Sequence, residues 1–147
     1  DDLDEKMAIY ATYSKLHTDD WRGPNNVGYV YIMQNNMDAA KKELDKANSL
    51  SPNNPVVNNN MGVFERSNGD NAKAMEYYAA ANGAGSAVGN NMGYLQMMAG
   101  DYSSAVANYG GTKTYNAALA QTLNGDHQTA LKTIDAFLFS DCIIFCF

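Results

Sequence analysis

The sequence predicts an all-α fold, a right-handed α–α superhelix (solenoid) of about four similar helix pairs with one extra helix at the N-terminal end. Three observations support this. Two short helical patterns joined by a tight turn form one unit, and this unit recurs along the chain with its landmarks in the same order. The small residues at the middle of the first helices also repeat, with Gly28 and Gly62 separated by 34 positions.

The clearest copy starts at Pro55, a residue suited to the first helical turn. Gly62 lies midway along its first helix, where a missing side chain lets two backbones approach closely. Gly69 is expected to end that helix in the left-handed conformation, and Asp70 to cap the next one. One face of the second helix carries apolar residues at helical spacing, namely Ala74, Tyr78 and Ala81.

The same landmarks recur before and after this copy. The preceding copy has Val27-Gly28, Asn35-Asn36, Ala40, Leu44, Ala47 and Pro52, and the next has Met92-Gly93, Gly100-Asp101, Ala105 and Tyr109. A more divergent copy has Ala117-Ala118, Gly125-Asp126, Ala130 and Ile134. From about Trp21 to Phe137 the sequence resembles the tetratricopeptide repeat family, whose two-helix unit has about 34 residues.

The repeats predict six segments: an N-terminal helix (1–20), four repeats (21–54, 55–85, 86–110 and 111–137) and an apolar tail (138–147). The N-terminal helix is either a cap or the second half of a preceding repeat, and Lys6 stands where the other copies have Ala. The first helix of the first repeat is expected from about Pro24 to Gln34. The third repeat is shortened and the fourth degenerate, since only about two helical turns fit between Tyr102 and Gly110-Gly111.

Composition and charge exclude some classes of partner. The chain is 46% apolar and 18% charged, with a net charge of −6. Nucleic acid and anionic membranes bind basic surfaces, so neither is expected as a partner. No membrane span is expected either, because the apolar end of the chain is shorter than about 20 residues. The composition fits a soluble protein of the cytoplasm or the periplasm.

The apolar tail has a composition unlike the rest of the chain. Four of the five Phe residues lie within residues 137–147, together with both Cys residues, Cys142 and Cys146. Three interpretations stay open: the tail closes the end of the solenoid, it pairs two chains in a homo-oligomer, or it is a truncated or out-of-frame gene end.

We expect no enzymatic activity, metal or cofactor. His17 and His127 belong to different repeats, so they are not expected to form one site. Two thiols fall short of the four ligands of structural zinc. The chain also lacks the phosphate-binding, nucleophile-elbow and zinc-binding motifs of common enzyme classes.

Asparagines recur once per repeat at the same place on the first helix. In a right-handed stack the first helices line the concave wall, so these amides are expected to form a ladder along a groove. An amide donates and accepts hydrogen bonds, which suits the backbone of an extended peptide, and Asn at this place fits the family pattern. The alternative is that these amides bond a neighbouring helix. The predicted groove residues are Asn25, Asn26, Tyr29, Met33, Asn59, Asn60, Arg66, Asn90, Asn91, Tyr94, Met97 and Asn116.

These features predict a non-enzymatic protein–protein interaction module that binds an extended peptide or protein segment in its concave groove. The alternative is a structural scaffold or spacer in a larger assembly, without a dedicated peptide ligand. The resemblance does not extend to receptors of chaperone tails, because the paired basic residues that clamp a terminal carboxylate are absent and only Arg22 and Arg66 are available.

Overall fold

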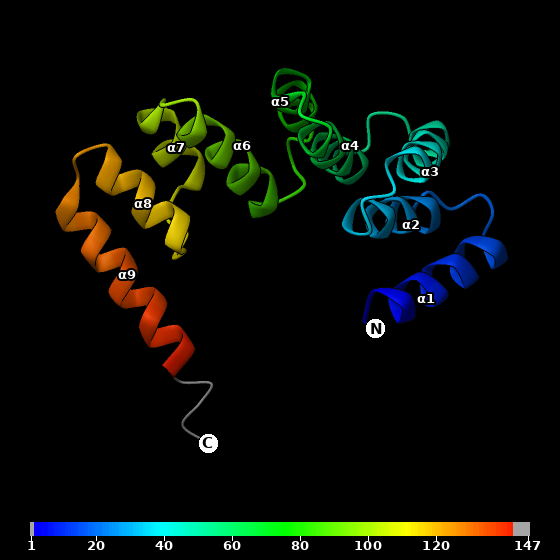
Figure 1. Ribbon diagram of the computed structural model, residues 1–147, viewed down its shortest axis with the longest axis horizontal. Coiled ribbons are helices and arrows are strands. Elements are labelled where there is room, and N and C mark those ends of the chain that lie inside the picture. Colours follow the sequence, from blue (N-terminus) through cyan, green and yellow to red (C-terminus); the bar gives the residue numbers. More distant parts are fainter. Residues whose placement is uncertain (1, 143–147) are drawn as a thin grey trace. The chain divides into compact units, whose positions relative to one another are not determined.

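The computed structural model describes the backbone of residues 2–142 and the side chains of residues 2–138. This part of the chain contains nine α-helices and no strand (Figure 1). The helices are α1 (Asp2–Leu16), α2 (Arg22–Met33), α3 (Met37–Leu50), α4 (Pro55–Ser67), α5 (Asn71–Ala80), α6 (Ser86–Met98), α7 (Tyr102–Tyr109), α8 (Tyr115–Leu123) and α9 (His127–Cys142). The predicted all-α fold of repeated helix pairs is confirmed.

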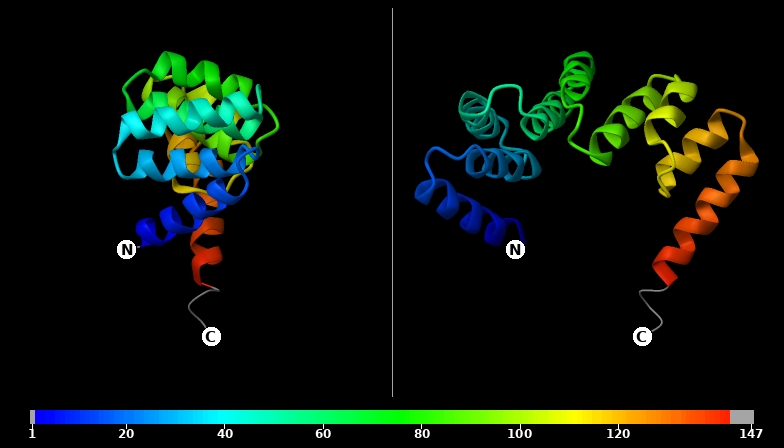
Figure 2. Two further views of the ribbon diagram at one scale, coloured as in Figure 1. Left: turned by 90° about the vertical axis from the view of Figure 1, so that its right-hand side faces the viewer. Right: turned by 180° about the vertical axis from the view of Figure 1, so that it is seen from behind.

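The chain divides into two compact units, Asp1–Gly85 and Ser86–Phe147. In the first unit α2 pairs with α3 and α4 pairs with α5, while α1 packs against α2 (Figure 2). The two pairs are stacked through contacts of α4 with α2 and α3. In the second unit α6 pairs with α7 and α8 pairs with α9, and α8 contacts both helices of the α6–α7 pair.

The predicted helix breaks are confirmed and have a local cause. The backbone takes positive φ at Asn35, Gly69, Gly100 and Gly125, at the end of the first helix of each pair. This left-handed conformation is cheap for Gly and tolerated by Asn, so the chain turns there within two residues. The next residue caps the following helix: the side-chain oxygens of Asn36, Asp70, Asp101 and Asp126 each accept a hydrogen bond from a backbone N–H three residues later.

The helices of each pair cross at the predicted small residues. A Cβ added at Gly28 would lie 2.8 Å from Leu44 Cγ, and one at Gly62 would overlap the ring of Tyr78. Leu44 and Tyr78 are fully buried. The large side chain of the second helix therefore occupies the space that the glycine of the first helix leaves open.

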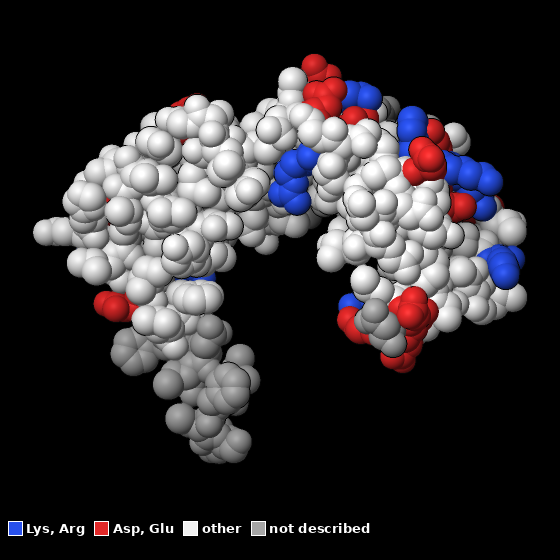
Figure 3. Space-filling model, viewed as in Figure 1, with Lys and Arg blue, Asp and Glu red and all other residues white. Residues whose placement is uncertain are grey.

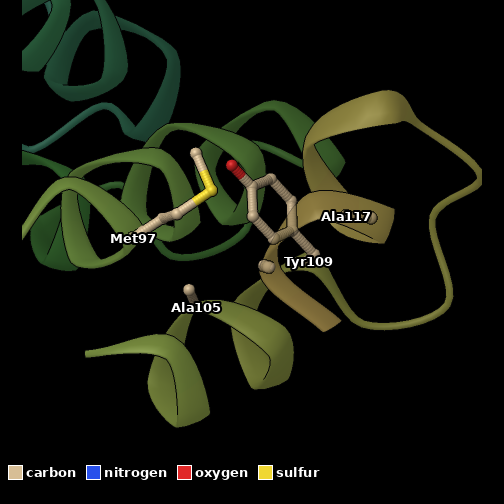
Figure 4. Close-up of a cluster of buried hydrophobic side chains, with 5 residues drawn as sticks. Met97, Ala105, Tyr109 and Ala117 are labelled. Carbon is tan, nitrogen blue, oxygen red and sulfur yellow. The ribbon is translucent and has the colours of Figure 1, made fainter. Parts of the chain in front are cut away.

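The second unit has shorter helices. Helix α7 ends at Tyr109, where Gly110 has a φ of 57°, and α8 begins after Thr114, whose side chain accepts a hydrogen bond from Ala117 N. Its core cluster consists of Met97, Ala105, Tyr109, Ala117 and Ala120, and Figure 4 shows the Tyr109 ring between Met97 and Ala117. The partly buried Tyr102, Val106 and Leu119 pack against this cluster.

Two boundaries differ from the sequence-based expectation. Helix α2 begins at Arg22 rather than Pro24, since proline lacks only an N–H that the first turn leaves unbonded. Helix α9 continues past Phe137 to Cys142, so the first residues of the predicted tail belong to a helix. The expected pairing or closing role of the tail rests on side chains outside the described residues. None of the described helices is long and apolar enough to span a membrane.

Candidate functional site

The candidate site of the first unit is the face that α2 and α4 share. Tyr29 and Met33 of α2 are 42% and 55% exposed, and Asn26 of α2 and Asn59 and Arg66 of α4 are partly exposed. Val56, at the start of α4, is 41% exposed. We call the surface formed by Asn26, Tyr29, Met33, Val56, Asn59 and Arg66 the α2–α4 surface.

A chain of side-chain amides connects the two helices. Asn59 Nδ2 donates to Asn60 Oδ1 at 3.4 Å, and Asn60 Nδ2 donates across the helix interface to Asn25 Oδ1 at 3.0 Å. Asn25 Nδ2 in turn donates to Asn26 Oδ1 at 3.1 Å. The donor-to-acceptor direction is the same in all three bonds, from Asn59 through Asn60 and Asn25 to Asn26.

Burial gives these four asparagines two different roles. Asn25 is 1% exposed and Asn60 is 8% exposed, so the two central amides bond each other inside the protein. Asn26 and Asn59, at the two ends, are partly exposed. The sequence did not distinguish these roles, because Asn25 and Asn59 share one repeat position and Asn26 and Asn60 share the next, yet each pair has one buried and one partly exposed member. Bonding to a neighbouring helix, the alternative interpretation, accounts for Asn25 and Asn60.

Two further polar contacts fix the position of α4. Asn58, which the sequence analysis did not single out, donates from Nδ2 to the carbonyl oxygen of Ala80 at 3.2 Å and so ties α4 to α5. Glu65 is 5% exposed and pairs with Lys73 Nζ at 2.5 Å.

Arg66 lies near Tyr78, whose hydroxyl is buried without a hydrogen bond. Burial raises the pKa of Tyr78, and Arg66 acts in the opposite direction.

A hollow of about 260 Å³ lies at the α1 side of the α2–α4 surface. It is lined by Ile9, Tyr10 and Tyr13 of α1 and by Arg22 and Asn26 of α2. Asn26 therefore belongs to both the surface and the hollow. The α1 residues were not among the predicted groove residues, although Tyr10 stands 34 positions before Leu44 and so has a core position in the repeat.

A polar cluster fixes one wall of this hollow. Asp20 Oδ2 accepts hydrogen bonds from Tyr13 Oη at 2.6 Å and from Arg22 Nη2 at 2.5 Å. The Arg22 guanidinium lies 5.9 Å from the centre of the Tyr13 ring, whose other neighbour is the His17 ring at 4.4 Å. The hydrogen bonds from Arg22 and Tyr13 hold the pKa of Asp20 well below its usual range. The charges of Asp20 and Arg22 thus offset each other.

The predicted groove residues of the second unit lie on α6 and α8. Asn90 and Asn91 are partly exposed, Tyr94 is 36% exposed, and Asn116 is exposed. Met97 is 8% exposed and belongs to the core cluster, so its burial leaves little of it for a ligand to touch (Figure 4). Met97 lies four residues after the mid-helix Gly93 and packs in a cluster with residues of α7 and α8.

Charged residues are unevenly distributed between the two units, as Figure 3 shows for one face. Within residues 86–147 the charged residues are Asp101, Lys113, Asp126, Lys132, Asp135 and Asp141. Among the residues that the structure describes, no group of three or more His, Cys, Asp or Glu could hold a metal ion.

Comparison with known proteins identifies the repeat. The family model of the tetratricopeptide repeat matches residues 25–54, which hold most of α2 and all of α3. Helices α2 to α9 follow the same two-helix pattern in four pairs, with a glycine crossing in each of the α2–α3, α4–α5 and α6–α7 pairs. The chain has the tetratricopeptide-repeat fold. Tetratricopeptide repeats are protein-interaction modules that bind proteins or peptides.

A solved structure has the same fold. The crystal structure of MamA protein superposes with a TM-score of 0.65 and 17% sequence identity, over 93% of this chain and 81% of that one. At this identity the similarity concerns the tetratricopeptide fold and not a shared ligand. No curated protein matches the sequence.

Proposed function

We propose that the chain is a non-enzymatic protein–protein interaction module whose α2–α4 surface binds an extended peptide segment. The observation that carries the proposal is the placement of two exposed apolar side chains, Tyr29 and Met33, beside the partly exposed amides of Asn26 and Asn59. An extended peptide offers alternating backbone polar groups and side chains, and this surface has a partner for each.

The amides supply the backbone contacts. Asn26 and Asn59 are anchored through Asn25 and Asn60, so their side chains are already oriented before a ligand arrives. Preorganised groups lose less conformational entropy on binding. Because an amide meets backbone groups and does not read side chains, these contacts favour an extended conformation over a particular sequence.

The apolar residues supply the side-chain contacts. Tyr and Met are well suited to contact surfaces, since the tyrosine ring gives a large rigid face and the thioether adapts to irregular partners. Tyr29, Met33 and Val56 together form the apolar part of the α2–α4 surface.

The charges favour an internal segment over a chain terminus. A terminal carboxylate is bound best by two basic groups with free hydrogen-bond donors. Arg22 donates to Asp20 through Nε and Nη2, and this carboxylate offsets its charge, which disfavours a second carboxylate there. The second unit carries its own amides and Tyr94, and we propose it as a further peptide-contacting surface.

A selection of displayed random peptides on the intact chain tests the proposal. Selected peptides are synthesised, and their affinities are measured by fluorescence anisotropy for wild type and for Tyr29→Ala, Met33→Ala and Asn59→Ala. Leu50→Ala and Asn48→Ala are matched controls, because both residues are exposed on α3, outside the proposed surface.

We expect Tyr29→Ala to weaken binding about tenfold, as truncation of an interface aromatic typically does. The two α3 variants should bind like wild type. Peptides that bind all variants equally, or a selection that yields no binder, would contradict the proposal and favour a scaffold or spacer role.

A further inference from the structure

The hollow between α1 and α2 has the size of one large side chain. Its volume is about 260 Å³. A cavity of about 150 Å³ accommodates benzene, whereas pockets for drug-sized ligands start at about 300 Å³. The hollow is therefore of a size suited to a single aromatic side chain.

The α1 wall of the hollow is a helix face that is covered elsewhere in the repeat. Lys6, Tyr10 and Tyr13 stand 34 positions before Ala40, Leu44 and Ala47. The latter three are 0% exposed because they pack against α2, the first helix of their own pair. On α1, Tyr10 and Tyr13 are partly exposed, and the neighbouring Ile9 is 57% exposed.

The same comparison argues against a helix as the occupant of this face. The two alanines of α3, like Ala74 of α5 and Ala81 directly after α5, are small and fully buried, which lets the first helix approach closely. Lys6 and Tyr13 replace both small positions on α1 with large side chains. A closely packed helix would overlap them, whereas one side chain from an extended segment fits between them and α2.

The walls are held in place before any ligand binds. Tyr13 is fixed by its hydrogen bond to Asp20 and by the His17 ring, and the backbones of α1 and α2 meet where a Cβ on Gly23 would lie 2.7 Å from Ser14 Cα. Asp20 also offsets the charge of Arg22 through paired hydrogen bonds. The hollow thus offers aromatic walls without a net charge, which favours an aromatic guest over a carboxylate.

Asn26, which lines the hollow, offers a hydrogen-bond donor. Its Oδ1 accepts from Asn25 Nδ2, so its own Nδ2 is the last donor of the amide chain. Since the three bonds of the chain run the same way, each polarises the next and makes the last N–H a better donor. A backbone carbonyl beside the guest side chain is its natural acceptor.

We propose that this hollow is the first side-chain subsite of the peptide surface, where an aromatic side chain of an extended segment lies between Tyr10, Tyr13 and Ile9 while Asn26 Nδ2 donates to the adjacent backbone carbonyl. The inference rests on the proposed function, because it extends the α2–α4 surface by one residue of the peptide.

A small probe tests the subsite directly. N-acetyl-phenylalanine amide is titrated into the intact, isotope-labelled chain, and NMR follows the side-chain NH2 signals of Asn26 and the ring signals of Tyr10 and Tyr13. The alanine and glutamate analogues of the probe serve as comparisons. We expect saturable shifts with the phenylalanine probe, and affinity about tenfold or more above that for the alanine probe, because an aromatic ring buries far more apolar area.

Three variants locate the binding. Ile9→Glu should abolish the response, while Leu16→Glu, on the same helix, 74% exposed and outside the hollow, should leave it unchanged. Asn26→Asp keeps the oxygen that Asn25 needs and removes the donor, so it should weaken binding of the probe without releasing Asn25. Equal affinity for all three probes, or loss of the response in Leu16→Glu, would overturn the subsite.

Two further outcomes separate the inference from the proposed function. If selected peptides depend on Tyr29 but tolerate replacement of each of their aromatic residues, the subsite is overturned and the proposed function stands. If no peptide depends on Tyr29, the proposed function falls, and the role of the hollow within a peptide surface falls with it. Shifts of α1 signals that depend on protein concentration alone would assign the hollow to a second copy of the chain and also overturn the inference.

Discussion

The side-chain amide of Asn60 donates to Oδ1 of Asn25, 35 positions earlier, at 3.0 Å. The bond joins the first helices of two successive repeats at a point where both residues are almost fully buried. A polar group buried there without its partner would be costly, so each asparagine depends on the other. The stack of α4 on α2 therefore has a specific hydrogen bond at its centre.

Asn60→Ala should destabilise the first unit. The substitution leaves Asn25 Oδ1 buried without a donor, which costs about 1 to 3 kcal/mol in the free energy of unfolding. Urea denaturation measures the change, with Asn48→Ala, an exposed asparagine of α3, as control. Wild-type stability in Asn60→Ala would contradict a structural role for this hydrogen bond.

Gly62→Ala should also destabilise the first unit, although alanine normally stabilises a helix interior by about 0.5 to 1 kcal/mol relative to glycine. The added methyl group would overlap the buried Tyr78 ring, and overpacking of this kind costs about 1 to 3 kcal/mol. Gly111→Ala is the control, since a methyl group there meets no atom within 4 Å. Thermal unfolding followed by circular dichroism compares the two, and an unchanged melting temperature for Gly62→Ala would contradict the crossing geometry.

The double substitution of Asp101→Asn and Asp126→Asn should make stability less sensitive to acid. Hydrogen bonds from Ser104 and Thr129 lower the pKa of these two capping carboxylates. A carboxyl whose pKa is lower in the folded state contributes stability above its unfolded pKa of about 3.9, and loses it as the pH falls through the folded pKa. Asparagine caps a helix about as well but does not titrate in this range.

Urea denaturation between pH 7 and pH 2.5 checks this prediction (the lower limit lies about 1.4 units below the unfolded pKa). The double variant should lose less stability than wild type on acidification. Asp38→Asn, an exposed carboxylate in the first turn of α3, is the control. Identical acid dependence in the double variant and wild type would refute a role for the two caps.

Asp20→Asn should loosen α1 without unfolding the other helices. Helix α1 has no fully buried side chain, so its attachment relies on partly buried contacts and on the cluster of Asp20, Tyr13 and Arg22. Losing the carboxylate removes the charge-assisted bonds to Arg22. Amide hydrogen exchange should become faster in α1 and stay unchanged in α4 and α5, with Asp19→Asn as the neighbouring exposed control. Equal exchange rates in α1 would show that the cluster does not hold the helix.

The sequence was sufficient to predict the helices and their order, because the signals that start and end them act within a few residues. Gly69 and Asp70 both act on backbone groups within one helical turn, and the predicted turn lies where the structure has it. Helix α9 exceeded its predicted end because no glycine or proline stops it between His127 and Cys142.

The candidate site could be predicted only in outline. The regular spacing of the asparagines indicated one shared face, but Asn25 and Asn60 became buried partners while Asn26 and Asn59 stayed partly exposed. Met97, which was predicted to line the groove, is likewise part of the core cluster. Which side of a helix is covered depends on the angle and distance of its neighbours, and these are set by contacts between residues far apart in the sequence.

The sequence by itself determined that this protein is an array of paired helices, since the caps, turns and glycine crossings are encoded locally in each repeat. Only the tertiary structure decided which amides bond each other and that Tyr10 and Tyr13 of α1 line a hollow beside Asn26. The physical reason is that burial and hydrogen-bond pairing depend on how helices pack across repeats, and a repeated sequence pattern gives equivalent residues the same signal whether or not a neighbour covers them.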